Sequence, residues 1–348
     1  MNKIRASIIG ASGYGGAEAV RLLTTHPQVE IVHVTAETQQ GQAMSNLYPN
    51  LRPFVDQTMV AVDAERIGRD SDVTFVSLPS GKAMHLVPAL LEHGGKVIDI
   101  AADFRLHDAA LYPTWYKFTH VAPTYLAEAV YGLPELHREA LRKTKLAAAP
   151  GCYPTSALLP LAPLLRAGLV ETRGIHIDAK SGVSGAGRTL ADQYLFAELD
   201  GNCHAYKPGF AHRHAPEIEQ EASEVAGGEV RVTFVPHLLP TARGLATSVY
   251  VRPRGGDAER ARRALHDAYD GEPFVRVLPE GETPTLQAVR GTNFCDVALF
   301  ADARNDTWIL LSTLDNLGKG ASGQAVQCAN LMCGFPETTG LLDTALLP

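Results

Sequence analysis

Short apolar runs alternate with helical patterns in the first part of the chain. The runs predict buried strands at 4–9, 29–36, 73–78 and 97–101. Between the strands, the spacing of apolar residues predicts helices at 15–25 and 82–92. Strand, helix and strand at these distances are typical of a parallel, doubly wound sheet. The first part is therefore predicted to be an α/β domain that ends near residue 149.

The pattern changes after residue 150. An apolar helix follows Cys152, and further strands are predicted at 174–181, 230–235, 244–251, 274–278 and 307–313. Helices are less frequent between these strands, which indicates a largely antiparallel sheet with helices on one side. A last helix at 321–333 is expected to pack back on the first domain. We therefore predict two domains, one of residues 1–149 with 318–348 and one of residues 150–317.

The composition narrows the class of protein. Of 348 residues, 45% are hydrophobic and 20% are charged, which is an ordinary globular balance. A net charge of -7 argues against broad attraction to nucleic acid or to an anionic membrane. No signal-type segment and no apolar stretch of about 18 residues is present, so we expect a cytoplasmic protein without a membrane span. The five cysteines are odd in number and form no CxxC pair, which argues against a disulfide scaffold and a structural zinc site. We accordingly expect no metal.

A glycine-rich loop joins the first strand to the first helix and reads Gly10-Ala-Ser12-Gly13-Tyr14-Gly15-Gly16. Glycines let a pyrophosphate approach backbone N–H groups, and the helix N-terminus adds a favourable dipole. The strand–turn–helix context favours a dinucleotide site over a plain tight turn. We predict that Gly10, Ser12, Gly13, Tyr14 and Gly15 bind the cofactor.

The end of the second strand leaves the choice of cofactor open. Glu37 lies where an acidic residue usually holds the ribose of NAD. No arginine follows to pair with a 2′-phosphate, although Thr35, Thr38 and Gln40 could hydrogen-bond one. From this segment alone, NAD and NADP both remain possible.

Cys152 is the candidate nucleophile. It lies in Ala149-Pro-Gly-Cys152-Tyr, between a strand and an apolar helix. A cysteine at a helix N-terminus gains thiolate character, and the free N–H groups there can stabilise an oxyanion. The alternative is a buried, inert cysteine, which is our interpretation of Cys203, Cys295, Cys328 and Cys333.

A thiolate needs an acid/base partner, and the densest candidate segment is His212-Arg213-His214-Ala-Pro-Glu217. Either imidazole could protonate an oxyanion or a leaving group, and Arg213 or Glu217 could orient it. The alternative is a polar loop that starts a helix, with Glu217 as a first-turn acid. His237 is a second candidate, more simply explained as a loop histidine.

Three further segments could bind anions or the cofactor. Ser181 lies in the donor-rich stretch Lys180–Arg188, and Arg105 follows a buried strand, so that it could clamp a carboxylate or phosphate. Asn316 and Lys319 lie in a strand–helix turn that could reach the cofactor. Each segment also has a structural explanation that stays open. The alternatives are, in the same order, a solvated glycine loop, a surface ion pair and a turn that only starts a helix.

The order of these motifs resembles that of the N-acetyl-γ-glutamyl-phosphate reductases, enzymes of arginine biosynthesis. The motifs that carry the resemblance are GASGYGGAE, LPSGKA, AADFRL, YGLPEL, APGCYPTSALLPLAPL, KSGVSGAGR, HRHAPEI, PHLLPTARG and DNLGKGASGQAVQ. The resemblance spans nearly the whole chain. It implies a Rossmann-type NADP-binding domain and an α+β domain of the glyceraldehyde-3-phosphate-dehydrogenase type.

The resemblance also implies a chemistry. Cys152 would attack an acyl phosphate, and NADPH would reduce the resulting thioester to an aldehyde. His212 and His214 match the family's histidine pair, and we favour His214 as the acid/base. Arg105 would hold the substrate carboxylate, with Ser181, Arg213 and Glu217 around the substrate.

Other functions stay open at this stage. The alternatives are an aspartate-semialdehyde dehydrogenase, a reductase of a carrier-protein-bound substrate, and a non-catalytic dinucleotide-binding redox sensor. The expected partners are a small acyl phosphate and further copies of the chain, as a homodimer or homotetramer.

Overall fold

The computed structural model describes residues 3–255 and 257–345. The chain forms two units, one of residues up to Pro150 together with Ala321–Leu342, and the other beginning at Gly151, running to Gly320 and resuming at Asp343. The predicted boundaries, 149/150 and 317/318, lie within a few residues of these positions. The predicted extents also include residues 1–2 and 346–348, which lie outside the described residues.

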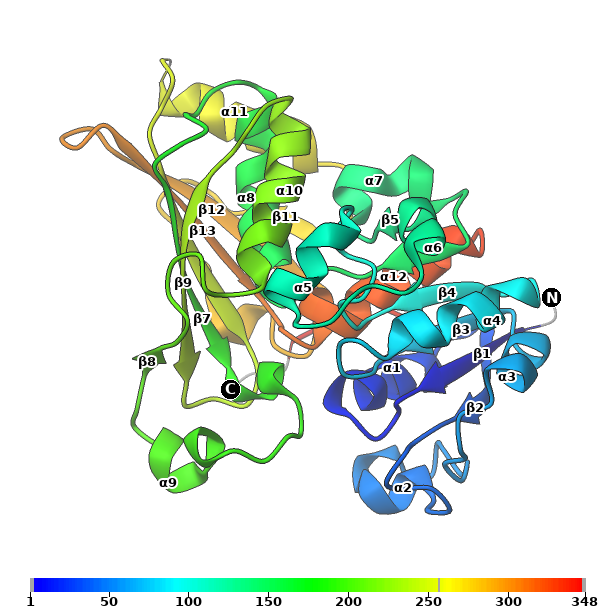
Figure 1. The fold of residues 1–348 in the computed structure, drawn as a ribbon. Helices are drawn as coiled ribbons and strands as arrows, with labels where there is room; N and C mark the ends of the chain where they lie inside the picture. Colours follow the sequence, from blue (N-terminus) through cyan, green and yellow to red (C-terminus); the bar gives the residue numbers. More distant parts are fainter. Residues whose placement is uncertain (1–2, 256, 346–348) are drawn as a thin grey trace. The chain divides into compact units, whose positions relative to one another are not determined.

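The first unit is built on a sheet of six strands in the order β2-β1-β3-β4-β6-β5 (Figure 1). Every paired strand runs parallel to its neighbours, which confirms the predicted doubly wound architecture. Its strands are β1 (Ile4–Ile9), β2 (Val29–Val34), β3 (Val73–Val76), β4 (Lys96–Asp99), β5 (Val130–Tyr131) and β6 (Leu146–Ala148). Its helices are α1 (Tyr14–Thr24), α2 (Met44–Leu47), α3 (Ala64–Asp70), α4 (Val87–Glu92), α5 (Tyr112–Trp115), α6 (Pro123–Glu128), α7 (Pro134–Leu141) and α12 (Gly323–Met332).

Several elements of the first unit are shorter than predicted, and two of them have a clear local reason. The helix predicted at 82–92 divides into a 3-10 turn at Ala83–His85 and α4, which begins at Val87 with a proline in its first turn. Proline favours that position because it has no N–H to donate. Strand β4 ends at Asp99 because the carboxylate of Asp99 accepts the N–H groups of Ala101 and Asp103.

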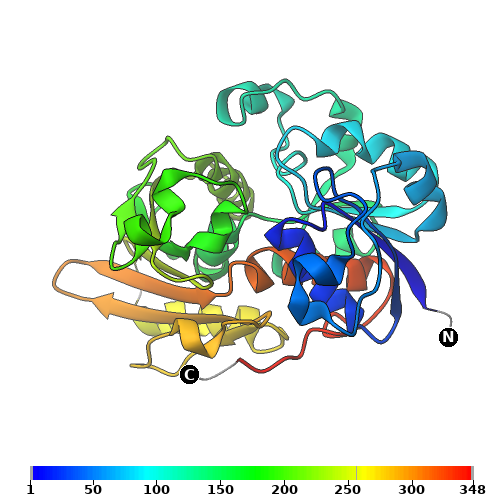
Figure 2. The ribbon, with the colours of Figure 1, turned by 90° about the horizontal axis from the view of Figure 1, so that it is seen from below.

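The last helix completes the first unit, as predicted. Helix α12 contacts α1, α7 and β4, and Figure 2 shows the red helix α12 beside the dark blue segment that carries α1. The Ser322 hydroxyl donates to the carbonyl of Gly15 at 2.7 Å, and the Gln324 amide donates to the carbonyl of Gly132 at 2.7 Å. The C-terminal helix is therefore part of the core that supports the glycine-rich loop.

The second unit contains a sheet of seven strands in the order β11-β12-β13-β10-β7-β9-β8. Four of its six pairings are antiparallel, which confirms the predicted largely antiparallel sheet. Its strands are β7 (Ile175–Gly182), β8 (His204–Ala205), β9 (Val232–Leu239), β10 (Leu245–Val251), β11 (Val275–Val277), β12 (Cys295–Asp302) and β13 (Thr307–Leu314). Its helices are α8 (Cys152–Arg166), α9 (Phe196–Leu199), α10 (His214–Ala226) and α11 (Ala258–Tyr269).

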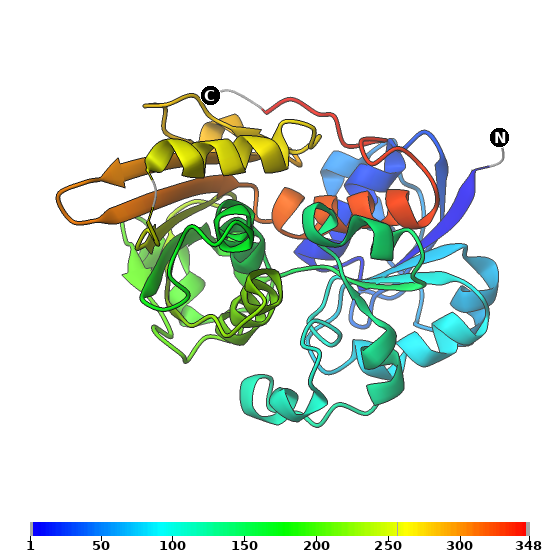
Figure 3. The same cartoon turned by 90° about the horizontal axis from the view of Figure 1, so that it is seen from above.

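Helices cover the second sheet. Helix α8 is buried along almost its whole length and packs on β10, β12 and β13, with α10 and α11 beside it. Figure 3 shows the yellow helix α11 alongside the orange strands β12 and β13. Strand β12 was not predicted from the sequence, although it pairs with β13 over eight residues. This packing brings the N-terminus of α8 to the end of the sheet where β7 turns into the Gly182–Ala186 segment.

Candidate active site

Cys152 is the first residue of α8, as the sequence predicted. Gly151 precedes it in an extended conformation and, as a glycine, supplies no side-chain cap to the helix. Cys152 is in no disulfide and is half-buried. A thiol in this position meets both the helix dipole and a set of N–H groups that can receive an oxyanion.

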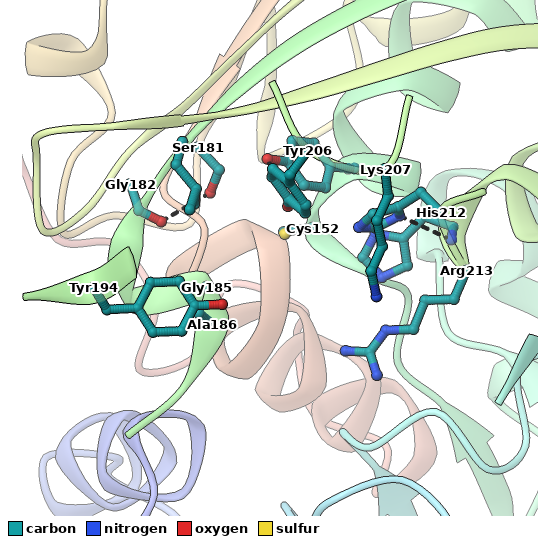
Figure 4. A pocket seen from close by; sticks show the side chains of 13 residues that line it. Cys152, Ser181, Gly182, Gly185, Ala186, Tyr194, Tyr206, Lys207, His212 and Arg213 are labelled. Atoms are coloured by element: carbon teal, nitrogen blue, oxygen red, sulfur yellow. Dashed lines mark hydrogen bonds between the residues drawn. The ribbon is translucent and has the colours of Figure 1, made fainter. Parts of the chain in front are cut away.

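The thiol faces a cavity of about 270 Å³ that lies within the second unit. In Figure 4, Cys152 lies between Ser181 and Tyr194 on one side and His212 and Arg213 on the other. The lining residues are Cys152, Tyr153, Ser181, Gly182, Gly185, Ala186, Tyr194, Tyr206, Lys207, His212, Arg213, His214 and Leu238. Of the predicted site residues, Cys152, both histidines, Ser181 and Arg213 thus line one cavity.

The first turn of α10 contacts Gly151, the residue before the nucleophile. The His214 ring lies directly on Gly151: a Cβ atom on this glycine would be 2.5 Å from Nε2 of His214. Glu217, one turn further along α10, is fully buried, and its Oε1 accepts the N–H of Gly151 at 2.8 Å. Glu217 therefore contacts the nucleophile loop and is not among the residues that line the cavity.

The two histidines differ in what surrounds them. His212 is buried, its Nδ1 accepts the N–H of His214 at 3.2 Å, and its ring packs edge-on against Tyr153 and Tyr206. Burial, together with the charges of Arg213 and Lys207, lowers the pKa of His212 to about 3. His212 is therefore neutral near pH 7, where it serves as a hydrogen-bond acceptor that fixes the start of α10.

The cavity carries positive charge in a chain whose net charge is -7. Lys207 and Arg213 contribute exposed cationic side chains, and none of the lining residues in the described part of the chain carries a carboxylate. Such a site attracts anionic groups such as phosphate or carboxylate. Lys207 is not among the predicted site residues, although it lies next to Tyr206 and five residues before His212.

Tyrosines form the wall that sequence reasoning missed. The Tyr206 hydroxyl donates to the Tyr153 hydroxyl at 3.2 Å, and the Tyr153 hydroxyl donates to the carbonyl of His237 at 3.0 Å. Burial raises the pKa of Tyr206 to about 12 and that of Tyr153 still further, so both stay protonated donors. Only the position of Tyr153 beside Cys152 signalled this wall in the sequence.

The predicted donor-rich stretch divides between two faces of the sheet. Ser181 and Gly185 line the cavity, and the Ser181 hydroxyl donates to the carbonyl of Gly182 at 3.1 Å. Lys180 instead pairs with Asp178, and Asp178 also lies 3.3 Å from Nδ1 of His237. Because successive side chains of a strand point to opposite faces, Lys180 is turned away from Ser181. The ring of His237, the second candidate for the acid/base, does not line the cavity.

Arg105 lies in the first unit and is almost fully buried. Its Nε donates to the carbonyl of Ala149 at 2.8 Å, and Nη2 donates to the carbonyl of Ile100 at 3.0 Å. The guanidinium therefore supports the backbone that leads, three residues later, to Cys152. A substrate contact of Arg105 remains a prediction.

The glycine-rich loop of the first unit is a backbone cradle. Gly10 has φ +84°, and a Cβ on it would be 2.2 Å from the carbonyl oxygen of Ser77. A Cβ on Gly16 would lie equally close, 2.2 Å, to the carbonyl oxygen of Gly10. Gly13 precedes α1 in an extended conformation, and α1 has neither a side-chain cap nor a first-turn acid. These features fit a pyrophosphate at the helix N-terminus.

Ser12, Tyr14 and Gly15 complete this loop. The Tyr48 hydroxyl donates to the carbonyl of Ser12 at 2.9 Å, which braces the loop from α2. The Tyr14 side chain is partly exposed, and a Cβ on Gly15 would lie 2.9 Å from the Ser77 hydroxyl oxygen. The loop is thus held open by contacts that leave little room for larger side chains.

The two remaining predicted cofactor residues belong to the second unit. The Asn316 side chain accepts the N–H of Gly244 at 2.8 Å and donates to the Ser184 hydroxyl at 2.9 Å. Lys319 is fully buried, with Nζ 5.9 Å from the centroid of the Phe274 ring. Both side chains contribute to the packing of the turn that precedes α12, and their contact with the cofactor remains a prediction.

Models of two protein families match the chain. Residues 5–144 match the model described as "Semialdehyde dehydrogenase, NAD binding domain", and residues 152–316 match "Semialdehyde dehydrogenase, dimerisation domain". The first match identifies a unit of the nicotinamide-dinucleotide-binding type. Among the helices of the described residues, none combines the length and apolar character needed to cross a membrane.

Solved structures share the fold at low sequence identity. Aspartate semialdehyde dehydrogenase II of Vibrio cholerae, complexed with ASA, is 19% identical, with a TM-score of 0.74 over 96% of this chain and 99% of that chain. The aspartate semialdehyde dehydrogenase of Candida albicans with NADP is 16% identical, with a TM-score of 0.71 over 95% of this chain and 99% of that chain. These matches establish the two-part fold alone.

Two curated relatives are much closer in sequence, and both are named N-acetyl-gamma-glutamyl-phosphate reductase. The protein from Symbiobacterium thermophilum is 50% identical over 98% of this chain and 98% of its own length. The protein from Pelotomaculum thermopropionicum is 49% identical over 99% of each chain. With identity of this level along the whole chain, and with the cysteine, the histidine pair and the glycine loop in place, the chain belongs to the N-acetyl-γ-glutamyl-phosphate reductase family.

Proposed function

We propose that the protein reduces N-acetyl-γ-glutamyl phosphate to N-acetyl-glutamate 5-semialdehyde with NADPH, as a step of arginine biosynthesis. The observation that carries the proposal is a helix-terminal thiol, Cys152, in one cavity with two imidazoles and two cations, Lys207 and Arg213. The names of the close relatives support the choice of substrate. None of the five cysteines, all of which are among the described residues, is in a disulfide, which is in keeping with a reducing, cytoplasmic environment.

The reaction begins at the sulfur. The Cys152 thiolate attacks the acyl carbon, the C–O bond to phosphate breaks, and a thioester remains. Lys207 and Arg213 stabilise the negative charge that gathers on the phosphate as it leaves. The N–H groups at the start of α8 stabilise the oxygen of the attacked carbonyl.

The second half of the reaction converts the thioester to the aldehyde. The bound NADPH supplies the hydride for this reduction. The oxyanion of the resulting thiohemiacetal re-forms the C=O bond, the C–S bond breaks, and His214 donates a proton to the leaving sulfur, which releases the aldehyde and the Cys152 thiol. We assign this role to His214 because its ring lies on Gly151, next to the nucleophile, whereas His212 is held neutral by burial. Glu217 is a positioning residue that holds the Gly151 N–H.

The cofactor would be held by the loop of the first unit. Backbone N–H groups of Tyr14 and Gly15 would face the pyrophosphate, with Gly10 allowing close approach and Ser12 adding a hydroxyl. Gly13 donates its own N–H to the Gly10 carbonyl at 3.2 Å and holds the turn in shape. Asn316 and Lys319 would shape the turn that leads into α12.

The reverse reaction tests the proposal. Purified protein is mixed with N-acetyl-glutamate 5-semialdehyde, phosphate and either NADP or NAD, and nicotinamide absorbance is followed. We expect phosphate-dependent formation of reduced cofactor, faster with NADP. Activity with aspartate semialdehyde alone would instead support an aspartate-semialdehyde dehydrogenase. Cofactor binding without reaction of either aldehyde would support the redox sensor.

We also propose that the protein is a homodimer that forms through the face of the second sheet opposite its helices. On this face the register places Ile309 beside Tyr250 and Phe300, and Leu311 beside Ser248. The Tyr250 side chain is 38% exposed, and the dimerisation-domain match covers the sheet. Such apolar surface is typical of an interface. Light scattering should give the mass of a dimer, and Leu311→Lys should shift it to a monomer; a wild-type monomer would refute this, and a tetramer would require a second interface.

A further inference from the structure

An ion pair crosses the carboxyl edge of the first sheet. Glu37 follows β2, Lys82 lies in the loop that follows β3, and Lys82 Nζ donates to Oε2 of Glu37 at 2.8 Å. Strand β1 lies between β2 and β3 and is followed directly by Gly10. The pair therefore spans the strand that opens the phosphate-binding loop, at the edge where nucleotides bind to doubly wound sheets.

Glu37 by itself presents a difficulty for NADP. A carboxylate at the end of the second strand accepts hydrogen bonds from the ribose hydroxyls of NAD and repels a 2′-phosphate. The neighbouring Lys82 lowers the pKa of Glu37, so the carboxylate is charged. The stretch Thr38–Gln42 offers amide and hydroxyl groups and no cation. Any cation for a 2′-phosphate must therefore come from another segment of the chain.

We propose that Lys82 binds the 2′-phosphate of NADP, and that Lys82 forms its ion pair with Glu37 when no phosphate is present. The inference rests on the proposed cofactor and names the residue that would select it. A lysine ammonium binds phosphate as a point charge and donates up to three hydrogen bonds. When the phosphate binds, the ion pair between Glu37 and Lys82 breaks and the Glu37 carboxylate is solvated.

The backbone around Lys82 is fixed, although its side chain is half exposed. Asp103 is fully buried, and its two carboxylate oxygens accept the N–H groups of Gly81 at 2.7 Å and Met84 at 3.1 Å. Gly81 has φ +90°, which a side chain would disfavour, and its hydrogen faces the Phe118 ring. Asp103 thus holds the loop backbone on both sides of Lys82 and fixes the position of the Lys82 Cα atom.

The exchange is easy because both partners are exposed. The side chain of Glu37 is 78% exposed and that of Lys82 is 51% exposed. Ion pairs between exposed groups contribute little to stability and rearrange readily. Thr35, by contrast, is buried and its hydroxyl accepts the N–H of Gly10 at 3.2 Å, so it braces the loop and does not compete for phosphate.

Binding measurements on the full-length protein test this assignment without catalysis. Calorimetric Kd values would be measured for NADP and NAD, and for the fragments 2′,5′-ADP and 5′-AMP, on wild type, Lys82→Ala and Lys82→Arg. We expect Lys82→Ala to weaken NADP and 2′,5′-ADP about tenfold or more, with NAD and 5′-AMP changed less than about twofold. Lys82→Arg should retain most of the NADP affinity because it keeps the cation.

Two further variants sharpen the result. Glu37→Gln should strengthen NADP and weaken NAD, because it removes both the repulsion and the ribose acceptor. Lys143→Ala, a lysine exposed elsewhere on the first unit, should change neither nucleotide. Thermal unfolding of each variant confirms that the fold is retained.

Three outcomes would overturn the assignment. If wild type prefers NADP and Lys82→Ala preserves that preference, Lys82 is not the selector, while the proposed cofactor stands. An equal rise of the Kd values for NADP and NAD in Lys82→Ala would mean that the lysine contacts a part of the nucleotide that both cofactors share. A wild type that binds NAD more tightly would refute the proposed cofactor together with this inference.

Discussion

The glycine loop of the first unit and the Cys152 cavity of the second, the two proposed anion sites, are built in different ways. The loop is one continuous segment that uses backbone N–H groups, and its glycines leave no space for side chains at Gly10 and Gly16. The cavity draws side chains from several segments, including Tyr206, Lys207 and Arg213. A site made of backbone is therefore damaged by adding atoms, whereas a site made of side chains is damaged by removing them.

The largest effect should follow from removing the nucleophile. Cys152→Ser replaces a thiol with a hydroxyl that is far less ionised, so kcat should fall by at least about 10³-fold. NADP binding by the first unit should be unchanged, which calorimetry would establish. Retained turnover in this variant would disprove the thioester route.

Adding a methyl group should break the backbone-built site. In Gly16→Ala the new Cβ would lie 2.2 Å from the carbonyl oxygen of Gly10, so the loop must move and the unfolding free energy should fall by about 3 kcal/mol. Gly13→Ala is the matched control, because its Cβ would meet the same oxygen at an ordinary 3.6 Å. Chemical denaturation would measure both; equal losses would mean that the close packing at Gly16 is not the cause.

The histidines should separate in their effect on rate. His214→Asn should lower kcat about 10²-fold because it removes the proton donor next to Gly151. His212→Asn keeps a hydrogen-bond acceptor for the His214 N–H and should have a much smaller effect. Steady-state kinetics at saturating cofactor would compare them, and the reverse order would assign the acid/base to His212.

The most gradual effect is a dependence of stability on pH. The pKa of His212 is about 3 in the folded protein, against about 6.5 in an unfolded chain, so unfolding takes up a proton between these values. His212 alone should make the unfolding free energy fall by about 1.4 kcal/mol for each pH unit lost in this window.

A buried carboxyl group in the first unit acts in the opposite direction. Burial and the charge of Asp103 raise the pKa of Asp99, so its stabilising contribution belongs to the protonated form and is lost as pH rises. The comparison must therefore be the difference between wild type and His212→Asn, measured by denaturation across pH 4 to 7. A difference that is independent of pH would show that His212 titrates normally.

The sequence predicted features made by one continuous segment well, and features made by residues from distant segments less well. The loop Gly10–Gly16 and the nucleophile Cys152 depend on neighbours in the chain, so their motifs indicated their roles directly. Lys82 lies 45 residues after Glu37, and only the strand order brings them together. Lys180 and Ser181 are adjacent in sequence and point to opposite faces, because the period of a strand decides where each side chain goes.

Burial was the other property that the sequence could not supply. Arg105, Glu217 and Lys319 resembled ligand-binding residues because charged side chains are usually exposed. The structure buries all three, and two of them bond to backbone on either side of Pro150, at Ala149 and Gly151. Strand β12 was missed because its apolar run lies between weakly patterned loops, and its pairing with β13 defines it.

The return of the chain to its first unit has a consequence for synthesis. Helix α12 is translated after every other helix and strand of the described residues, yet it packs on α1 and β4, which are translated before the whole second unit. All strands of the second unit are translated before α12, the helix that completes the first unit. A nascent chain would therefore complete its thiol-bearing half before its nucleotide-binding half, and a message truncated shortly before the codon for Ala321 would yield a protein whose earliest segment never finishes folding.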